Sequence, residues 1–276
     1  MLEFIQGKQT VRLSNSIQLD LLIKGQGNPV LWLHSGFRGR IGLGNLVTAV
    51  EKKLKQENNA WLHIIPNLPG FGESTPGPSG NTNPYELTDA IEELICLLNY
   101  PSIDVIGYSL GANIASILAN RNPEKIHRVV LLGTAIEGSN LDIYRRMLDM
   151  HNDQNWEGLV NEIAQNLVGK KNRSQYARMM PLVKKQVSSK RFSQDLTRIL
   201  SSGVRLDVFK EIESITHPML MISGKEDPFV PRPGRIEMLK QKDNIKLVLL
   251  DGIGHNELVF PRQIDLSDQI IDFLQN

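Results

Sequence analysis

Unbroken runs of valine, isoleucine and leucine recur along this chain and constrain its fold more than any other feature. Runs that are apolar at every position, rather than at every second one, indicate strands buried on both faces of a sheet. Strands are expected at 16–25, 28–35, 60–68, 103–109, 127–135, 217–224 and 245–252. Helical spacing of apolar residues is found at 46–56, 84–98 and 110–121. This alternation predicts an α/β protein with a mostly parallel sheet flanked by helices.

A long stretch without a convincing strand interrupts the alternation. From Ile136 to Glu213, apolar residues recur mainly at helical spacing, as in "WEGLVNEIAQNLVG" (156–169). A stretch of this length is too long for a simple loop between two core strands. We therefore expect a core made of residues 1–135 and 214–276, with a helical cap inserted at 136–213.

Composition and charge argue against several classes of protein. The formal net charge of +1 gives no global field that would attract nucleic acid. No apolar stretch approaches the roughly 18 residues of a membrane span, and the N-terminus does not have the pattern of a signal peptide. We therefore expect a cytoplasmic protein. The single cysteine, Cys96, cannot form an internal disulfide, and its place in "IEELICLL" predicts a buried core thiol.

A serine lies between two glycines in "DVIGYSLGAN" (104–113), where a strand is expected to end and a helix to begin. A sharp turn of this G-x-S-x-G type holds the serine in a strained conformation at the carboxyl edge of a sheet. Side chains at Gly107 and Gly111 would clash there, and the following helix offers free N–H groups and a positive dipole end. We expect Ser109 to be a nucleophile; the alternative is a serine that only caps the helix.

A nucleophilic serine needs a base, and one of the six histidines follows the last predicted strand. His255 lies in the glycine-rich segment "DGIGHNE", whereas His34 ends a strand well before the serine. An acid must hold the imidazole, and Asp227 follows the penultimate strand, with Glu226 beside it as an alternative. The chain order Ser109, Asp227, His255 is that of one specific architecture.

N–H donors are also needed near the serine, because acyl transfer places negative charge on a substrate oxygen. One donor is expected at Leu110, directly after the nucleophile. The other is expected in the loop "WLHSGFRG" (32–39), at Gly36 or Phe37. The alternative for this loop is a plain glycine turn.

Taken together, these motifs resemble those of the α/β-hydrolase fold family, in a form with a helical cap. The matching segments, within residues 32–256, are "LHSGFRG", "NLPGFGES", "GYSLGA", "ISGKEDPFVP" and "GIGHN". The resemblance implies an eight-stranded, mostly parallel sheet flanked by helices. Ser35 stands where this family usually has glycine, and Asn67 where it usually has aspartate. Relatives resembling haloalkane dehalogenases and epoxide hydrolases carry aspartate in place of Ser109, so those chemistries are set aside.

The resemblance implies a serine hydrolase that cleaves a small carboxylic ester, or a related acyl substrate such as a lactone or thioester, through an acyl-enzyme. His255 would take the proton of Ser109 while Asp227 orients His255, and no cofactor or metal is implied. The alternatives are a C–C bond hydrolase, a lyase or cofactor-free oxygenase on the same fold, and a non-catalytic ligand-binding or receptor protein. We expect a monomer or homodimer that acts on a small acyl molecule.

Basic residues are concentrated in one part of the predicted cap, where no acid accompanies them. The eight residues are Lys170, Lys171, Arg173, Arg178, Lys184, Lys185, Lys190 and Arg191. A solvated helical face would explain them; the alternative is an electropositive cap that attracts an anionic or carrier-linked substrate. The predicted cap also contains methionines, which could line a cavity but are more often core. They are Met147, Met150, Met179 and Met180.

Overall fold

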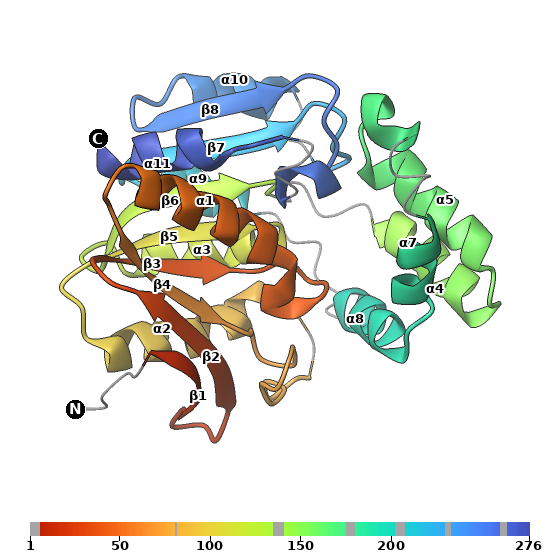
Figure 1. The fold of residues 1–276 in the computed structure, drawn as a ribbon, viewed down its shortest axis with the longest axis horizontal. Coiled ribbons are helices and arrows are strands. Elements are labelled where there is room, and N and C mark those ends of the chain that lie inside the picture. The colour runs from red at the N-terminus through yellow and green to blue at the C-terminus, as the bar shows by residue number, and fades with distance from the viewer. Residues whose placement is uncertain are drawn as a thin grey trace.

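An eight-stranded sheet forms the centre of the computed structural model, with strand order β1-β2-β4-β3-β5-β6-β7-β8 (Figure 1). The structure describes residues 6–80, 82–134, 141–174, 180–201, 208–229, 233–259 and 264–276. The strands are β1 (Gly7–Arg12), β2 (Gln18–Gly25), β3 (Asn28–Leu33), β4 (Trp61–Pro66), β5 (Ile103–Tyr108), β6 (Ile126–Leu132), β7 (Met219–Gly224) and β8 (Ile245–Leu250). β2 pairs antiparallel with β1 and with β4, and all other pairs are parallel. The predicted mostly parallel sheet is confirmed.

Helices cover both faces of this sheet, because neighbouring residues of each buried strand point to opposite sides. On β3, Leu31 and Leu33 belong to one apolar cluster and Val30 and Trp32 to another. The first cluster packs against α2 (Pro84–Leu98), α3 (Leu110–Arg121) and α9 (Phe209–Ser214). The second packs against α1 (Gly44–Gln56) and α11 (Ser267–Gln275). The remaining elements outside the predicted cap are η1 (Gly39–Leu43), α10 (Pro233–Lys240) and η3 (Asn256–Val259).

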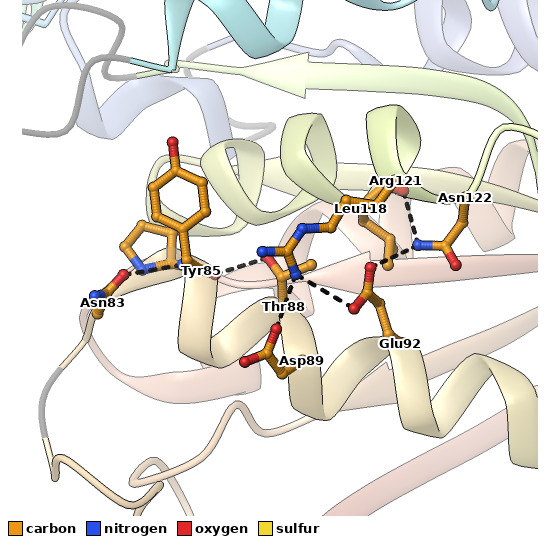
Figure 2. Close-up of polar contacts among 9 residues, drawn as sticks. Asn83, Tyr85, Thr88, Asp89, Glu92, Leu118, Arg121 and Asn122 are labelled. Carbon is orange, nitrogen blue, oxygen red and sulfur yellow. Dashed lines mark hydrogen bonds and ion pairs between the residues drawn. The ribbon is translucent and has the colours of Figure 1, made fainter.

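Polar contacts hold the far end of α3 against α2 (Figure 2). The Arg121 guanidinium lies 2.8 Å from Asp89 and 3.3 Å from Glu92. Asn122 donates a hydrogen bond of 2.8 Å to Glu92, and Arg121 also lies 5.9 Å from the centre of the Tyr85 ring. Exposed ion pairs of this kind contribute only about 0–1 kcal/mol. The position of α3, whose other end meets Ser109, therefore depends chiefly on its buried apolar face.

Cys96 is exposed, which contradicts the predicted buried thiol. The buried stripe of α2 runs through Ile91, Leu94, Ile95 and Leu98. Cys96 follows Ile95 by one residue, which turns it about 100° further around the helix, away from the core. The apolar run "IEELICLL" hid this because it contains more apolar residues than the buried stripe needs.

Four helices lie together beyond the carboxyl ends of the parallel strands (Figure 1). They are α4 (Leu141–Asn152), α5 (Trp156–Leu167), α7 (Met180–Val187) and α8 (Lys190–Ser201), with the short η2 (Lys170–Asn172) after α5. We call them the helical segment. They share an apolar cluster of their own, in which Met147 is buried and Met150 packs at its margin. Met179 and the side chain of Met180 lie outside the described residues.

The end of the predicted cap range packs with the sheet rather than with the helical segment. Phe209 and Ile212 of α9 belong to the same apolar cluster as α3. Residues 208–213 therefore lie with the core, although the sequence prediction placed them in the cap. Across the described part of the chain, no helix combines the length and apolar character needed to cross a bilayer.

Candidate active site

Ser109 lies in the turn between β5 and α3, with backbone angles φ 54° and ψ −116°. Residues other than glycine rarely adopt a positive φ, so the turn is strained. A Cβ on Gly107 would lie 2.3 Å from the carbonyl oxygen of Gly111, and a Cβ on Gly111 would lie 2.0 Å from that of Leu33. Only glycine fits at either position. The tight turn expected from the G-x-S-x-G spacing is therefore present.

Two loops bring His255 and Asp227 to Ser109. The Nε2 atom of His255 lies 3.0 Å from the Ser109 Oγ, and its Nδ1 lies 2.7 Å from the Asp227 Oδ2. Since a carboxylate only accepts hydrogen bonds, Nδ1 carries the proton and Nε2 is free to accept that of the serine. The other Asp227 oxygen accepts a 2.8 Å hydrogen bond from the Phe229 N–H, so the carboxylate is itself fixed.

Aromatic rings confine the imidazole of His255. The Tyr108 ring stacks on it at 5.2 Å between centres, and the Phe229 ring meets it edge-on at 4.8 Å. The Tyr108 hydroxyl donates a 3.1 Å hydrogen bond to the His255 carbonyl. Burial raises the pKa of Tyr108 well above its usual value, so this hydroxyl stays protonated as a donor. A Cβ on Gly133 would lie 3.1 Å from Nδ1, which leaves the ring little freedom on that side.

The structure separates the two acids that the sequence left open. Glu226 does not meet His255; it accepts a 2.7 Å hydrogen bond from the Lys170 N–H in the helical segment. Asp227 is the acid beside the imidazole.

A third acid, Glu257, was not singled out from the sequence. Its fully buried carboxylate accepts hydrogen bonds from the Gly169 N–H at 2.7 Å, the Asn172 side chain at 3.0 Å and the Gly254 N–H at 3.2 Å. Glu257 therefore ties the loop of His255 to the helical segment. No sequence signal would have found this role, because the two partners on the side of the helical segment are 85 and 88 residues away.

The residues expected to donate to a substrate oxyanion gather at the same edge of the sheet. Leu110 is the first residue of α3, where backbone N–H groups have no partner within the helix. Gly36 and Phe37 follow β3, which pairs with β5 so that Leu33 lies opposite Gly107. Hydrogen bonds among the described residues include none from the Phe37 N–H. These three residues remain the proposed source of the oxyanion donors.

His34, at the end of β3, holds this loop and is not available as a base. Its Nε2 accepts a 2.9 Å hydrogen bond from the Leu68 N–H, and its Nδ1 lies 2.6 Å from the Ser35 carbonyl. Complete burial lowers the pKa of His34 to about 4, so the ring is neutral with its proton on Nδ1. Ser35 donates to the Phe37 carbonyl at 3.2 Å, a contact that the usual glycine could not make.

Residues 29–260 match the sequence profile of the alpha/beta hydrolase fold. The chain belongs to this family. A 2-hydroxy-6-oxononadienedioate/2-hydroxy-6-oxononatrienedioate hydrolase of Pseudomonas putida is 22% identical over 94% of this chain and 92% of the relative. A pimeloyl-[acyl-carrier protein] methyl ester esterase of Aeromonas hydrophila is 30% identical over 40% of this chain and 39% of the relative. The family profile and these two relatives support the assignment of this chain as a hydrolase.

A solved structure with the same α/β-hydrolase fold is that of a thermophilic esterase from Thermogutta terrifontis. Its TM-score is 0.73 at 18% identity, and the match covers 97% of this chain and 98% of that structure. Among the residues that the structure describes, no three His, Cys, Asp or Glu side chains cluster as metal ligands would. The described site thus consists of a hydroxyl, an imidazole and a carboxylate beside backbone N–H groups, which are the groups of nucleophilic acyl transfer.

Helix α8 packs directly on the loop expected to supply an oxyanion donor. The Phe37 ring stacks on Phe192 at 5.4 Å between centres. A Cβ on Gly36 would lie 3.0 Å from a side-chain carbon of Ile199. The buried carboxyl of Asp195 lies 3.5 Å from the backbone nitrogen of Arg38 in the same loop. The helical segment therefore forms one wall of this loop.

Asn67, which departs from the usual pattern, belongs to a buried network behind the loop. Its amide donates to the Asp20 carboxylate at 2.7 Å and its oxygen accepts from the Arg40 N–H at 2.8 Å. Asp20 and Arg40 form an ion pair of 2.8 Å. Asparagine can both donate and accept here, whereas an ionised aspartate would face Asp20 with a second negative charge.

Proposed function

We propose that this α/β hydrolase cleaves a small carboxylic ester, or a related acyl substrate such as a lactone or thioester, through an acyl-enzyme on Ser109. The observation that carries the proposal is the hydrogen-bonded chain from Ser109 through His255 to Asp227. This order of hydroxyl, imidazole and buried carboxylate suits a serine nucleophile activated by a general base. The match to hydrolases supports the same class of reaction.

In the first half-reaction, the Ser109 Oγ attacks the substrate carbonyl carbon while His255 Nε2 takes the hydroxyl proton. The negative charge that develops on the carbonyl oxygen is met by the N–H of Leu110 and by that of Gly36 or Phe37. The intermediate collapses when His255 gives its proton to the leaving oxygen. An alcohol leaves, and the acyl group stays on the serine.

In the second half-reaction, a water molecule takes the place of the alcohol. His255 removes a proton from this water as its oxygen attacks the acyl carbon, and the same oxyanion donors act again. The proton returns to the Ser109 oxygen as the carboxylic acid leaves. Asp227 stabilises the charged imidazolium in both half-reactions and keeps its proton on Nδ1.

We further propose that the helical segment acts as a cap that selects the substrate. Six of its basic residues are exposed, namely Lys170, Lys171, Lys184, Lys185, Lys190 and Arg191, while Arg178 lies outside the described residues. Burial lowers the pKa of His34 and raises that of Asp195, and the charge of Arg191 is a smaller contribution that acts downward on both, which supports its proximity to the site. An anionic or carrier-linked acyl substrate would be attracted by this face.

A C–C bond hydrolase is the second candidate. It is favoured by the Pseudomonas putida hydrolase, which matches this chain over 94% of its length. Cleavage of a carbon–carbon bond beside a carbonyl can use the same serine, imidazole and carboxylate. The difference lies in the leaving group, which would be carbon instead of oxygen.

The first experiment is the hydrolysis of p-nitrophenyl esters from acetate to decanoate by the wild type, Ser109→Ala and Ser214→Ala. Ser214 is an exposed serine at the end of α9 and serves as the control. Turnover that is lost only in Ser109→Ala supports the acyl-enzyme proposal. Turnover that survives in Ser109→Ala refutes it. A folded wild type that cleaves no ester would favour the second candidate or a ligand-binding protein, and the substrates named for the Pseudomonas putida relative would then be tested.

The charge proposal has its own test. Values of kcat/KM for a p-nitrophenyl ester with a terminal carboxylate should fall steeply as salt rises, while those for the matched uncharged ester stay level. Equal salt dependence of the two esters would remove the idea of an anion-attracting cap.

A further inference from the structure

Tyr144 of α4 lies over the candidate site between two of its walls. Its ring lies 5.9 Å from Phe37, in the proposed oxyanion loop, and stacks on Phe229 at 5.8 Å and 15°. Phe229 in turn meets His255 edge-on at 4.8 Å. Tyr144 therefore reaches from the helical segment to the loops that carry both the proposed oxyanion donors and the imidazole.

The hydroxyl of Tyr144 has no hydrogen-bond partner within the described part of the chain, although the residue is only 7% exposed. Buried tyrosine hydroxyls usually find a partner, and leaving one unpaired costs about 1–3 kcal/mol. The oxygen is not among the unpaired polar atoms that are sealed from solvent. The residue keeps 7% of its surface exposed, so it is not completely enclosed.

The state of this hydroxyl is also defined by its surroundings. Burial, with the negative charge of Asp227 as the second cause, raises the pKa of Tyr144 far above its usual value. The hydroxyl therefore keeps its proton over the working pH range. Its nearest aromatic neighbours, Phe37 and Phe229, have side chains without any acceptor oxygen. A donor is thus held beside the site, and none of the described residues accepts its hydrogen bond.

We propose that the Tyr144 hydroxyl donates a hydrogen bond to an acceptor oxygen in the acyl part of the substrate, so that the site prefers acyl chains bearing an ether, keto or hydroxyl oxygen. The proposal rests on the acyl-enzyme function above and names its substrate class. The acyl part of the substrate stays beside Ser109 through both half-reactions, so the Tyr144 hydroxyl can donate to it in each of them. An alkyl chain in the same place would leave the hydroxyl unpaired.

The test compares Tyr144→Phe with the wild type on two matched pairs of p-nitrophenyl esters. The pairs are butyrate with methoxyacetate, and pentanoate with 3-methoxypropanoate, in which an ether oxygen replaces one methylene. In Tyr144→Phe, kcat/KM for at least one ether ester should fall about fivefold relative to its alkyl partner. Tyr100→Phe, which removes a hydroxyl just before β5 at the opposite edge of the sheet, should leave both ratios unchanged. Melting temperatures show whether each variant is folded.

The outcomes separate this proposal from the one on which it rests. If Tyr144→Phe changes the ether and alkyl esters by the same factor in both pairs, the hydroxyl does not read the substrate, while the hydrolase proposal stands. If the wild type cleaves no ester at all, both proposals are overturned. A selective loss on the ether esters supports both.

Discussion

Replacing Asp195 by asparagine tests how the helical segment is fastened to the proposed oxyanion loop. The residue is 2% exposed, with one carboxyl oxygen 3.3 Å from the Arg198 guanidinium and the other 3.5 Å from the backbone nitrogen of Arg38. Neither contact replaces the lost water fully, so burial raises the pKa of Asp195 to about 6. At neutral pH the folded protein therefore carries an unfavourable buried charge.

The sign of the effect follows from proton binding. Between about pH 4 and pH 6 the folded state keeps a proton that the unfolded state releases, so the free energy of unfolding falls as pH rises. About two pKa units at about 1.4 kcal/mol each give a loss of up to about 3 kcal/mol above pH 6. Asparagine cannot ionise and escapes this loss. Because about 1 kcal/mol of this loss is already present at pH 4.5, Asp195→Asn should gain about 2 kcal/mol relative to the wild type between pH 4.5 and pH 7.5.

Urea unfolding at the two pH values, followed by tryptophan fluorescence, measures this gain. The free energy of unfolding of Asp195→Asn minus that of the wild type is compared between the two pH values. Any effect of the substitution that does not depend on pH then cancels. Asp142→Asn, which alters an exposed carboxyl on α4 paired with Arg145 at 3.0 Å, is the matched control. If the difference in unfolding free energy between Asp195→Asn and the wild type is the same at both pH values, or changes in the opposite direction, the inference of an unfavourable buried charge at Asp195 is wrong.

Three further outcomes are expected. Gly111→Ala places a Cβ 2.0 Å from the Leu33 carbonyl oxygen, and should lower the free energy of unfolding by about 3 kcal/mol or more, seen as a lower melting temperature or lost soluble yield. Glu257→Gln exchanges one acceptor oxygen for a donor beside N–H groups such as that of Gly169; it should cost about 1.5–3 kcal/mol in urea unfolding and lower kcat for ester hydrolysis. His34, with a pKa of about 4, should stay neutral at pH 5.5 by NMR, and titration near pH 6.5 would contradict its burial.

The central sheet was predictable because its strands are apolar at nearly every position. All seven strands expected from the sequence are present as β2 to β8, each within two or three residues at either end. The strand that residue patterns did not reveal is β1, with the sequence "GKQTVR". It lies at the edge of the sheet beside β2 and buries only Val11 fully. A half-exposed edge strand needs few apolar residues and so leaves little trace in the sequence.

The site was predictable as far as local geometry determines it. The spacing of Gly107 and Gly111 was sufficient to expect the turn at Ser109, because any side chain there collides with backbone. The sequence favoured Asp227 as the acid but left Glu226 as an alternative, since both precede the same proline-containing loop. Their difference depends on which way each side chain leaves the turn. One meets His255 and the other meets the Lys170 N–H, and these distant partners are brought there only by the complete fold.

The helical segment contacts the proposed catalytic loops at two places, and these contacts determine which kinetic constants its substitutions should change. Phe192 braces the proposed oxyanion loop through Phe37. Gly169 approaches the loop of His255 so closely that a Cβ on it would lie 2.1 Å from the Gly252 carbonyl oxygen. A cap that only enclosed the substrate would stabilise the bound ground state and the transition state equally, so substitutions in it would change KM and leave kcat unchanged. Because this segment also fixes loops that act only as charge develops, its variants should lower kcat as well.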